Sequence, residues 1–167
     1  MRKKKGYSLW ILPQKKVSDK FQKIISLNAK KYNFPDFIPH ITINSYSNKK
    51  SLDELNFKKS KKIKVHVNDI KKKNYFYYSI FLDIELKKKL INFHKKTQKN
   101  SIKKKFIPHL SLIYSNNKTL KIRIFKEIKD NNNFKNMSFF CDRVAFIRFN
   151  EIKEEWKIIK LFKLTSA

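Results

Sequence analysis

Residues 37–43 read Phe-Ile-Pro-His-Ile-Thr-Ile, and residues 106–112 read Phe-Ile-Pro-His-Leu-Ser-Leu. The two stretches begin 69 residues apart, and four of their seven positions are identical. The other three positions exchange Ile for Leu or Thr for Ser, which preserves polarity at each position. This is the one internal similarity that we find in the chain. Two of the four histidines of the protein occupy the same place in it.

Both stretches have the pattern of a strand that begins after proline, a residue that the first position of a strand tolerates. Side chains then alternate between the two faces of the sheet, so His40 shares a face with Thr42, and His109 with Ser111. The Ile and Leu residues between them point to the opposite face and pack on a core. One interpretation is that each His only satisfies a local hydroxyl. Packing, however, needs the apolar positions and neither the His nor the hydroxyl, so the repeated pair favours a functional site.

Two facing imidazoles suit in-line displacement at phosphorus. One removes a proton from water and the other protonates the leaving alkoxide, and both forms of His are available near neutral pH. The hydroxyls of Thr42 and Ser111 are suited to holding the non-bridging oxygens. The sequence has no His-x-x-x-His, no paired Cys and few carboxylates near either motif, so we expect neither a metal nor a cofactor.

The paired His-x-Thr/Ser motifs resemble the signature of the two-histidine (2H) phosphoesterases. Together with Tyr-Ser-Leu-Trp-Ile-Leu-Pro at residues 7–13, they look like the eukaryotic-type cyclic phosphodiesterase branch. The order and spacing of segments agree from about residue 7 to residue 164. The two motifs and the Tyr-Ser-x-Trp start are specific, whereas the middle and the C-terminal third match in pattern only.

The resemblance implies a bilobal α+β fold, in which two antiparallel sheets with flanking helices surround a central cleft. One domain would cover residues 1–167. The implied activity is metal-independent hydrolysis of nucleoside 2′,3′-cyclic phosphates or of ADP-ribose 1″,2″-cyclic phosphate. The product in this branch would be a 2′-phosphomonoester or, from the ADP-ribose compound, the 1″-phosphate.

The resemblance also implies the roles of site residues. His40 and His109 would be the acid/base pair, with the two roles unassigned because the motifs are nearly equivalent. Thr42 and Ser111 would bind the phosphate. The resemblance also places three aromatic residues in the cleft, where they would stack on a base or flank the sugar: Trp10, Tyr77 and Tyr114.

These aromatic residues have an alternative interpretation, because aromatic side chains on strands usually belong to the core. Tyr114 has a further difficulty. It follows Ser111 by three residues, so strict alternation places it on the opposite face unless the strand bends or ends. Of the other histidines, His66 fits a surface strand position, and His94 fits the edge of a core on a helix.

The hydrophobic periodicity predicts alternating strands and helices along the chain. Strands are expected at residues 7–12, 40–46, 63–70, 75–82, 109–114, 139–149 and 156–164, the last two as a pair. Helices are expected at 18–32 with Ser18 as N-cap, at 51–59 opened by Ser51, at 85–99 and at 119–129, the last of which also allows a strand.

The net charge of +28 first points to a nucleic-acid binder. Lys, however, outnumbers Arg 37 to 4, and Lys, Asn, Ile, Phe and Tyr account for 96 of the 167 residues, as an AT-rich coding sequence would produce. Selected phosphate contacts favour Arg, whose planar fork grips phosphate with two bonds. The charge therefore does not identify the site, although it attracts anions in a salt-dependent way.

The length and composition fit one domain with a sizeable core. No apolar run approaches the ~20 residues that span a bilayer, and the basic start is too short for a signal peptide. A single cysteine, Cys141, leaves no internal disulfide, so we expect a cytoplasmic protein. We also expect a monomer without a membrane partner.

We therefore expect an enzyme that acts on a small cyclic phosphate nucleotide. One alternative is an RNA 2′,3′-cyclic phosphodiesterase or 2′-5′ RNA ligase-like enzyme that acts on RNA ends. The other alternative is a catalytically idle RNA- or nucleotide-binding module on the same fold.

Overall fold

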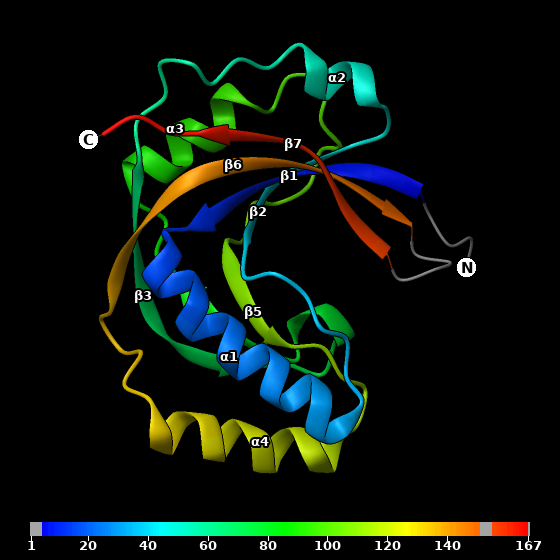
Figure 1. The fold of residues 1–167 in the computed structure, drawn as a ribbon, viewed down its shortest axis with the longest axis vertical. Coiled ribbons are helices and arrows are strands. Elements are labelled where there is room, and N and C mark those ends of the chain that lie inside the picture. Colours follow the sequence, from blue (N-terminus) through cyan, green and yellow to red (C-terminus); the bar gives the residue numbers. More distant parts are fainter. Residues whose placement is uncertain (1–4, 151–154, 167) are drawn as a thin grey trace.

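A computed structural model describes residues 5–150 and 155–166 and shows a strongly curved sheet with helices at both ends (Figure 1). The basic start at residues 1–4 lies outside the described residues. The strands are β1 (Lys5–Pro13), β2 (Ile41–Tyr46), β3 (Ile63–Lys72), β4 (Ile80–Ile84), β5 (His109–Ile113), β6 (Ser138–Asn150) and β7 (Glu155–Lys163).

The helices are α1 (Lys15–Tyr32), α2 (Lys49–Asp53), α3 (Lys88–Lys96) and α4 (Lys118–Asn131), with a 3₁₀ turn η1 (Phe76–Tyr78). Residues 119–129, for which the sequence allowed a helix or a strand, are therefore helical. The longer helices bury an apolar stripe at helical spacing; in α1 the stripe consists of Phe21, Ile25 and Ala29.

All strand pairs are antiparallel, apart from one isolated bridge near the C-terminus. The strand order is β1-β2-β5-β4-β3-β6-β7, and β6 also pairs with β1. Six strands thus form a closed ring of backbone pairings, with β7 attached to the outside of β6. Closure leaves few unpaired strand edges, which protects the backbone against pairing with other chains.

The strands fall into two groups, as the sequence predicted, but the groups are joined. The α+β class and the flanking helices agree with the prediction. The expected separation into two sheets is wrong in one respect, because β6 is 13 residues long and continues from one group to the other. Its first residues pair with β3, whereas its remainder pairs with β1 and β7.

The second join lies between the two motif strands. Strands β2 and β5 pair at a single position, where Ile41 faces Leu110. Both side chains are completely buried in the main core. On each side of this one pair the strands diverge, and α3 fills part of the gap: the Asn44 side chain donates to the carbonyl of His94, and the Tyr46 hydroxyl to that of Thr97.

The prediction of a buried strand over residues 75–82 is wrong in its first half. Residues 76–78 form η1, β4 begins at Ile80, and Tyr75 is well exposed. The turn depends on Ser79, which lies completely buried and whose hydroxyl is 2.6 Å from the carbonyl of Phe76 and 2.7 Å from that of Ser115. A serine inside an aromatic run thus ends the strand pattern, because its hydroxyl competes with the ladder for backbone groups.

Two predicted helix starts are also wrong. Helix α1 begins at Lys15, directly after Pro13 ends β1, and Gln14 rather than Ser18 is its N-cap. Helix α2 begins at Lys49 because the side chain of Asn48 accepts a hydrogen bond from the N–H of Ser51, at 3.0 Å. It ends at Asp53, and α3 is likewise shorter than predicted. No helix in the described part of the chain is long and apolar enough to span a membrane.

Candidate active site

A pocket of about 300 Å³ opens between the two groups of strands. That volume lies at the lower end of the range for small-molecule sites. Its walls include residues from β1, β2, β5, β6 and β7, from η1 and α3, and from the loop before β5. All seven site residues predicted from the sequence line this pocket, namely Trp10, His40, Thr42, Tyr77, His109, Ser111 and Tyr114.

The single pair between β2 and β5 sets the arrangement of the two motifs. The Ile41–Leu110 pair brings the strand of His40 and Thr42 next to the strand of His109 and Ser111. Alternation turns these four side chains to the face opposite Ile41 and Leu110. The four side chains, one imidazole and one hydroxyl from each motif, line the same pocket.

Each of the two motif imidazoles is held by its own backbone. The Nδ1 of His40 lies 2.7 Å from the carbonyl oxygen of Ile38, and the Nδ1 of His109 lies 2.9 Å from that of Ile107. A carbonyl only accepts hydrogen bonds, so each Nδ1 carries its proton and donates. The second nitrogen, Nε2, is thereby left to accept or release a proton in both motifs.

His40 is buried in aromatic surroundings. Its ring stacks on Trp10, with centroids 3.4 Å apart and an angle of 7° between the planes, and meets the edge of Phe37 at 6.2 Å. Only 7% of the residue is exposed. Burial lowers the pKa of His40 to about 3, the bond to Ile38 opposes this, and the nearby charge of His109 lowers the pKa further. His40 is consequently neutral across the physiological range.

His109 is less buried and has charged neighbours. Its ring contacts Tyr78 at 4.1 Å between centroids and the edge of Phe81 at 5.6 Å. Burial lowers its pKa and so does the charge of Lys73, whereas the bond to Ile107 and the carboxylate of Asp83 raise it. Protonation therefore costs less at His109 than at His40.

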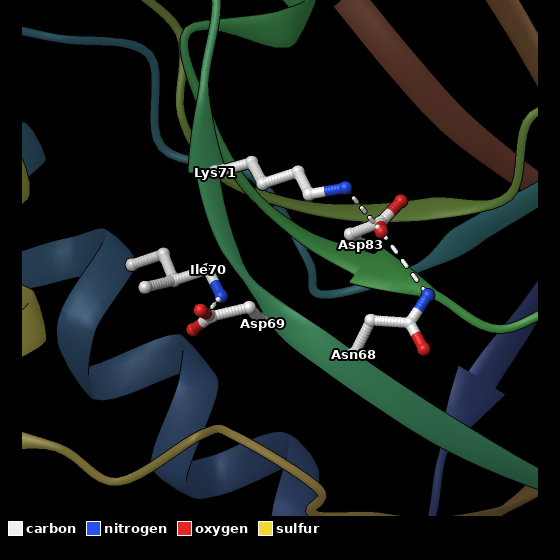
Figure 2. Close-up of polar contacts among 5 residues, drawn as sticks. All are labelled: Asn68, Asp69, Ile70, Lys71 and Asp83. Atoms are coloured by element: carbon white, nitrogen blue, oxygen red, sulfur yellow. Dashed lines mark hydrogen bonds and ion pairs between the residues drawn. The ribbon is translucent and has the colours of Figure 1, made fainter.

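Asp83 owes its place to the register between β4 and β5, which pairs it with His109. Figure 2 shows its carboxylate between the side chains of Lys71 and Asn68 on β3, at 2.7 and 3.1 Å. Asp69 lies on the other side of the strand, where its carboxylate accepts from the N–H of Ile70 (Figure 2). Asp83 is thus the carboxylate of this group that acts on His109.

The two hydroxyls have different surroundings. Ser111 is buried and its hydroxyl donates to the carbonyl of Tyr77 at 3.2 Å. It also forms a hydrogen bond with the side chain of Tyr114, which partly opposes the rise that burial causes in the Tyr114 pKa. Thr42 is half-buried at the pocket wall. Both hydroxyls are therefore within the pocket, but that of Ser111 belongs to a hydrogen-bonded group.

Tyr114 reaches the pocket because β5 ends at Ile113, one residue before it. Its ring stacks on Phe37 at 4.1 Å and meets the edge of Tyr77 at 5.3 Å. The difficulty raised by strict alternation is thereby resolved by the end of the strand. Tyr77 lies on η1 and is 45% exposed, so it is a rim residue and not part of the core.

Sequence reasoning missed several residues that line the pocket. Trp156 of β7 packs against the cluster around Trp10 and lies 6.3 Å from Tyr114. His94 is buried, stacks on Phe106 at 4.1 Å, and its Nδ1 lies 3.0 Å from the carbonyl of Ile43. No motif marks these positions, because tertiary contacts bring them to the pocket. Tyr78, Lys104 and Lys105 are further lining residues that the sequence did not single out.

Within residues 5–150 and 155–166, no three His, Cys, Asp or Glu side chains come together as a metal ion would require. Cys141 is completely buried on β6, and burial raises the pKa of its thiol. A buried, protonated thiol is a poor nucleophile and a poor metal ligand. The imidazoles and hydroxyls of the two motifs, in contrast, line the pocket.

Neither a comparison with protein-family models nor one with curated protein sequences gives a match. Solved structures do match over the whole chain. Escherichia coli LigT in complex with NADP+ superposes with a TM-score of 0.60 and 13% identity, covering 97% of this chain and 99% of LigT. TT0787 of Thermus thermophilus gives 0.63 and 10%, covering 96% and 98%, and a structure described as a phosphoesterase gives 0.61 and 12%, covering 98% and 100%.

The chain has the LigT fold. This agrees with the 2H phosphoesterase fold that the paired motifs predicted. Sequence identities of 10–13% establish the architecture and not the activity. In this LigT-like fold, the pocket brings together two imidazoles, two hydroxyls and a set of aromatic rings.

Proposed function

We propose that this protein is a cyclic phosphodiesterase that hydrolyses 2′,3′-cyclic phosphates of nucleotides. The observation that carries the proposal is the matched geometry of His40 and His109. Each donates from Nδ1 to the carbonyl two residues before it, and each keeps Nε2 available in one small pocket. Two such groups with hydroxyls beside them are suited to proton transfer around a phosphate.

We assign the base role to His40 and the acid role to His109. His40 removes a proton from water, whose oxygen attacks phosphorus in line with the leaving oxygen. The P–O3′ bond breaks, and His109 gives its proton to the departing 3′-oxygen, which leaves a 2′-phosphomonoester. His40 is suited to the base role because burial keeps it neutral, and His109 to the acid role because Asp83 favours its protonated form. A bound phosphate anion raises both pKa values.

The hydroxyls of Thr42 and Ser111 hold the non-bridging oxygens in this proposal, and they stabilise the charge that accumulates there in the transition state. Trp10, Tyr77 and Tyr114 flank the sugar and the base. LigT has been crystallised with 3′-AMP, with ATP and with NADP+. Those complexes support a nucleotide as the ligand of a pocket in this fold. ADP-ribose 1″,2″-cyclic phosphate is a second substrate of the same chemistry.

The test is turnover of a nucleoside 2′,3′-cyclic phosphate by purified protein in EDTA, with product identification by ³¹P NMR. We expect activity that survives the chelator and a 2′-phosphate product. His40→Ala and His109→Ala should each lower kcat by ~100-fold or more, whereas His66→Ala on β3 should not. Unchanged rates in both pocket variants would overturn the proposal, and loss of activity in EDTA would contradict its metal-free form.

A second candidate is the same chemistry on RNA ends, as in a 2′,3′-cyclic phosphodiesterase or 2′-5′ RNA ligase-like enzyme. The net charge of +28 favours it, because a polyanion gains more from that field than a mononucleotide does. A catalytically idle nucleotide-binding module is the remaining alternative. Binding without turnover in the assay above would identify it.

A further inference from the structure

One lysine lies over the two aromatic rings that contact His109. The Nζ of Lys73 is 5.4 Å from the ring centroid of Tyr78 and 5.9 Å from that of Phe81. Both rings contact the imidazole of His109, at 4.1 and 5.6 Å between centroids, and they meet each other edge to face at 5.5 Å. The ammonium, the two rings and the imidazole therefore form one packed group.

Hydrogen bonds on both sides of Lys73 fix its backbone. Its N–H donates to the carbonyls of Tyr78 and Ser79, at 3.0 and 3.2 Å. Its own carbonyl accepts from the Nζ of Lys121 on α4, at 2.8 Å, and Lys121 is almost completely buried. Lys73 directly follows β3, so these bonds hold it against η1, the turn that carries Tyr78. The fold thus determines where this lysine begins.

The position of Lys73 distinguishes it from the many other lysines of the chain. Several cations lie over aromatic rings in the described residues, and Lys73 is the one whose rings contact a motif histidine. The rings of Trp10 and Phe37, which contact His40, have no such cation in the same part of the chain. Lys73 also forms no ion pair there, so no carboxylate neutralises its charge.

The charged and titratable groups around His109 come from several elements. Asp83 lies on β4, Lys73 follows β3, Tyr78 lies on η1 and His40 precedes β2. Burial lowers the pKa of His109 most, and among the charges Lys73 lowers it by more than Asp83 raises it. Burial raises the pKa of Tyr78, so its phenol stays neutral. The other titratable residues that line the pocket are Tyr77, His94, Lys104, Lys105 and Tyr114.

We propose that Lys73 is a positioning residue for His109. It holds the two rings against the imidazole, and its charge makes the imidazolium release its proton more readily. Lys73 and Asp83 then act in opposite directions on one ring, and both set the acid strength of His109. The inference rests on the proposed function where it concerns catalysis, whereas the effect of Lys73 on the imidazole can be measured without turnover.

The first measurement is an NMR titration of the His109 imidazole in the free protein, with its signal assigned from its loss in His109→Gln. Lys73→Met keeps a flexible apolar side chain on the rings and removes the charge, so His109 should titrate at higher pH. Lys73→Arg should restore the wild-type titration. Lys72→Met is the matched control and should change nothing, because Lys72 lies over the ring of Phe125. An unmoved titration in Lys73→Met would overturn the inference and leave the proposed function standing.

Catalysis should show the same change. On adenosine 2′,3′-cyclic phosphate, the falling limb of kcat/KM should move to higher pH in Lys73→Met. Well above that limb the variant should exceed the wild type by about two- to threefold, as the loss of one solvent-screened charge predicts. Lys73→Met/Asp83→Asn should bring the limb back toward its wild-type position. A loss at every pH without movement of the limb would overturn the inference, because a residue that only supports the fold gives that result.

Salt provides a further readout, because Lys73 is exposed and its field is screened by ions. The difference between the His109 titrations of the wild type and Lys73→Met should shrink as the ionic strength rises. A difference that stays constant would contradict the role of the charge. If no cyclic phosphate is turned over but Lys73→Met still shifts the NMR titration, the proposed function fails and the action of Lys73 on His109 stands.

Discussion

The two copies of the motif differ less in sequence than in what surrounds them. In the first copy, His40 lies flat against Trp10 and is almost completely buried. In the second, His109 is partly exposed and stands across from Asp83 on the neighbouring strand. The internal geometry is the same, because each imidazole donates to the carbonyl two residues earlier. The neighbouring strands therefore make two chemically different groups out of one repeated motif.

This difference shows how a repeat can supply both an acid and a base. The Trp10 indole helps to bury His40, which raises the free energy of its charged form. The Asp83 carboxylate lowers the free energy of the charged form of His109. The motif itself provides the tautomer and the direction of Nε2, whereas β1 and β4 provide the difference in pKa. Substitutions at the two motifs and at their neighbours test this difference between His40 and His109.

The largest effect on kcat should come from substitution of the two histidines, measured on two substrates with different leaving groups. On a nucleoside 2′,3′-cyclic phosphate, His40→Ala and His109→Ala should each lower kcat by ~100- to 10,000-fold. On thymidine 3′-(4-nitrophenyl phosphate), whose leaving group needs no proton, His109→Ala should recover most of its loss and His40→Ala should not. Steady-state kinetics with both substrates measures this. The reverse pattern would exchange the two roles.

The hydroxyls should give a smaller and unequal effect. Thr42→Val should lower kcat/KM by about 10- to 100-fold, the worth of one hydrogen bond to a charged phosphate. Ser111→Ala should lose less, about tenfold, because the Ser111 hydroxyl gives up its bond to the Tyr77 carbonyl when it donates to phosphate. Thr119→Val, on the exposed surface of α4, is the matched control. Equal losses in the two motif variants would show that the Tyr77 contact has no influence.

The sequence determined the four polar positions because alternation on a strand is a local property. Spacing alone placed His40 with Thr42, and His109 with Ser111, on one face of each strand, and the structure brings both pairs to one pocket. Tyr114 could not be placed, since its position depends on where β5 ends. The surroundings that separate the two histidines could not be predicted either. Asp83 meets His109 through the register of β4 on β5, which no motif in the sequence marks.

The same limit explains the errors in the fold. Periodicity identified most strands and helices, but it did not show that Ser79 turns an aromatic run into η1, because that depends on the carbonyl of Ser115, 36 residues away. Nor did it show that β6 joins both groups of strands, since pairing partners are set by tertiary packing. Trp156, Lys104 and Lys105 also line the pocket, and no local pattern in the sequence places them there.

The pH dependence of kcat/KM should follow the protonation of His109, the proposed acid. His109 has to be protonated in the free enzyme, and its pKa is lowered below the ordinary 6.5. Raising the pH through that pKa removes the acid, so kcat/KM should fall about tenfold per pH unit above it. Asp83→Asn removes the carboxylate that raises the pKa of His109, so the falling limb of the pH profile should move to lower pH. Asp69→Asn, which faces the other way, should leave the limb in place (Figure 2). A limb that stays unmoved in Asp83→Asn would exclude the carboxylate as the tuning group.

The last predicted effect is on stability against acid. The folded-state pKa of His40 is about 3, below its ordinary value of 6.5. Between these pH values His40 is therefore protonated in the unfolded chain and neutral in the folded chain. The free energy of unfolding should therefore fall as the pH decreases from 6.5 toward 3, by up to about 1.4 kcal/mol per pH unit for this group. His40→Gln removes the proton-binding group and should make the melting temperature less sensitive to pH across this window. His109→Gln should do so to a lesser degree, because His109 is less buried and Asp83 offsets part of its shift. Thermal melts of both variants from about pH 4 to 7 measure the two slopes, and equal slopes would mean that the indole and the carboxylate do not distinguish the two copies.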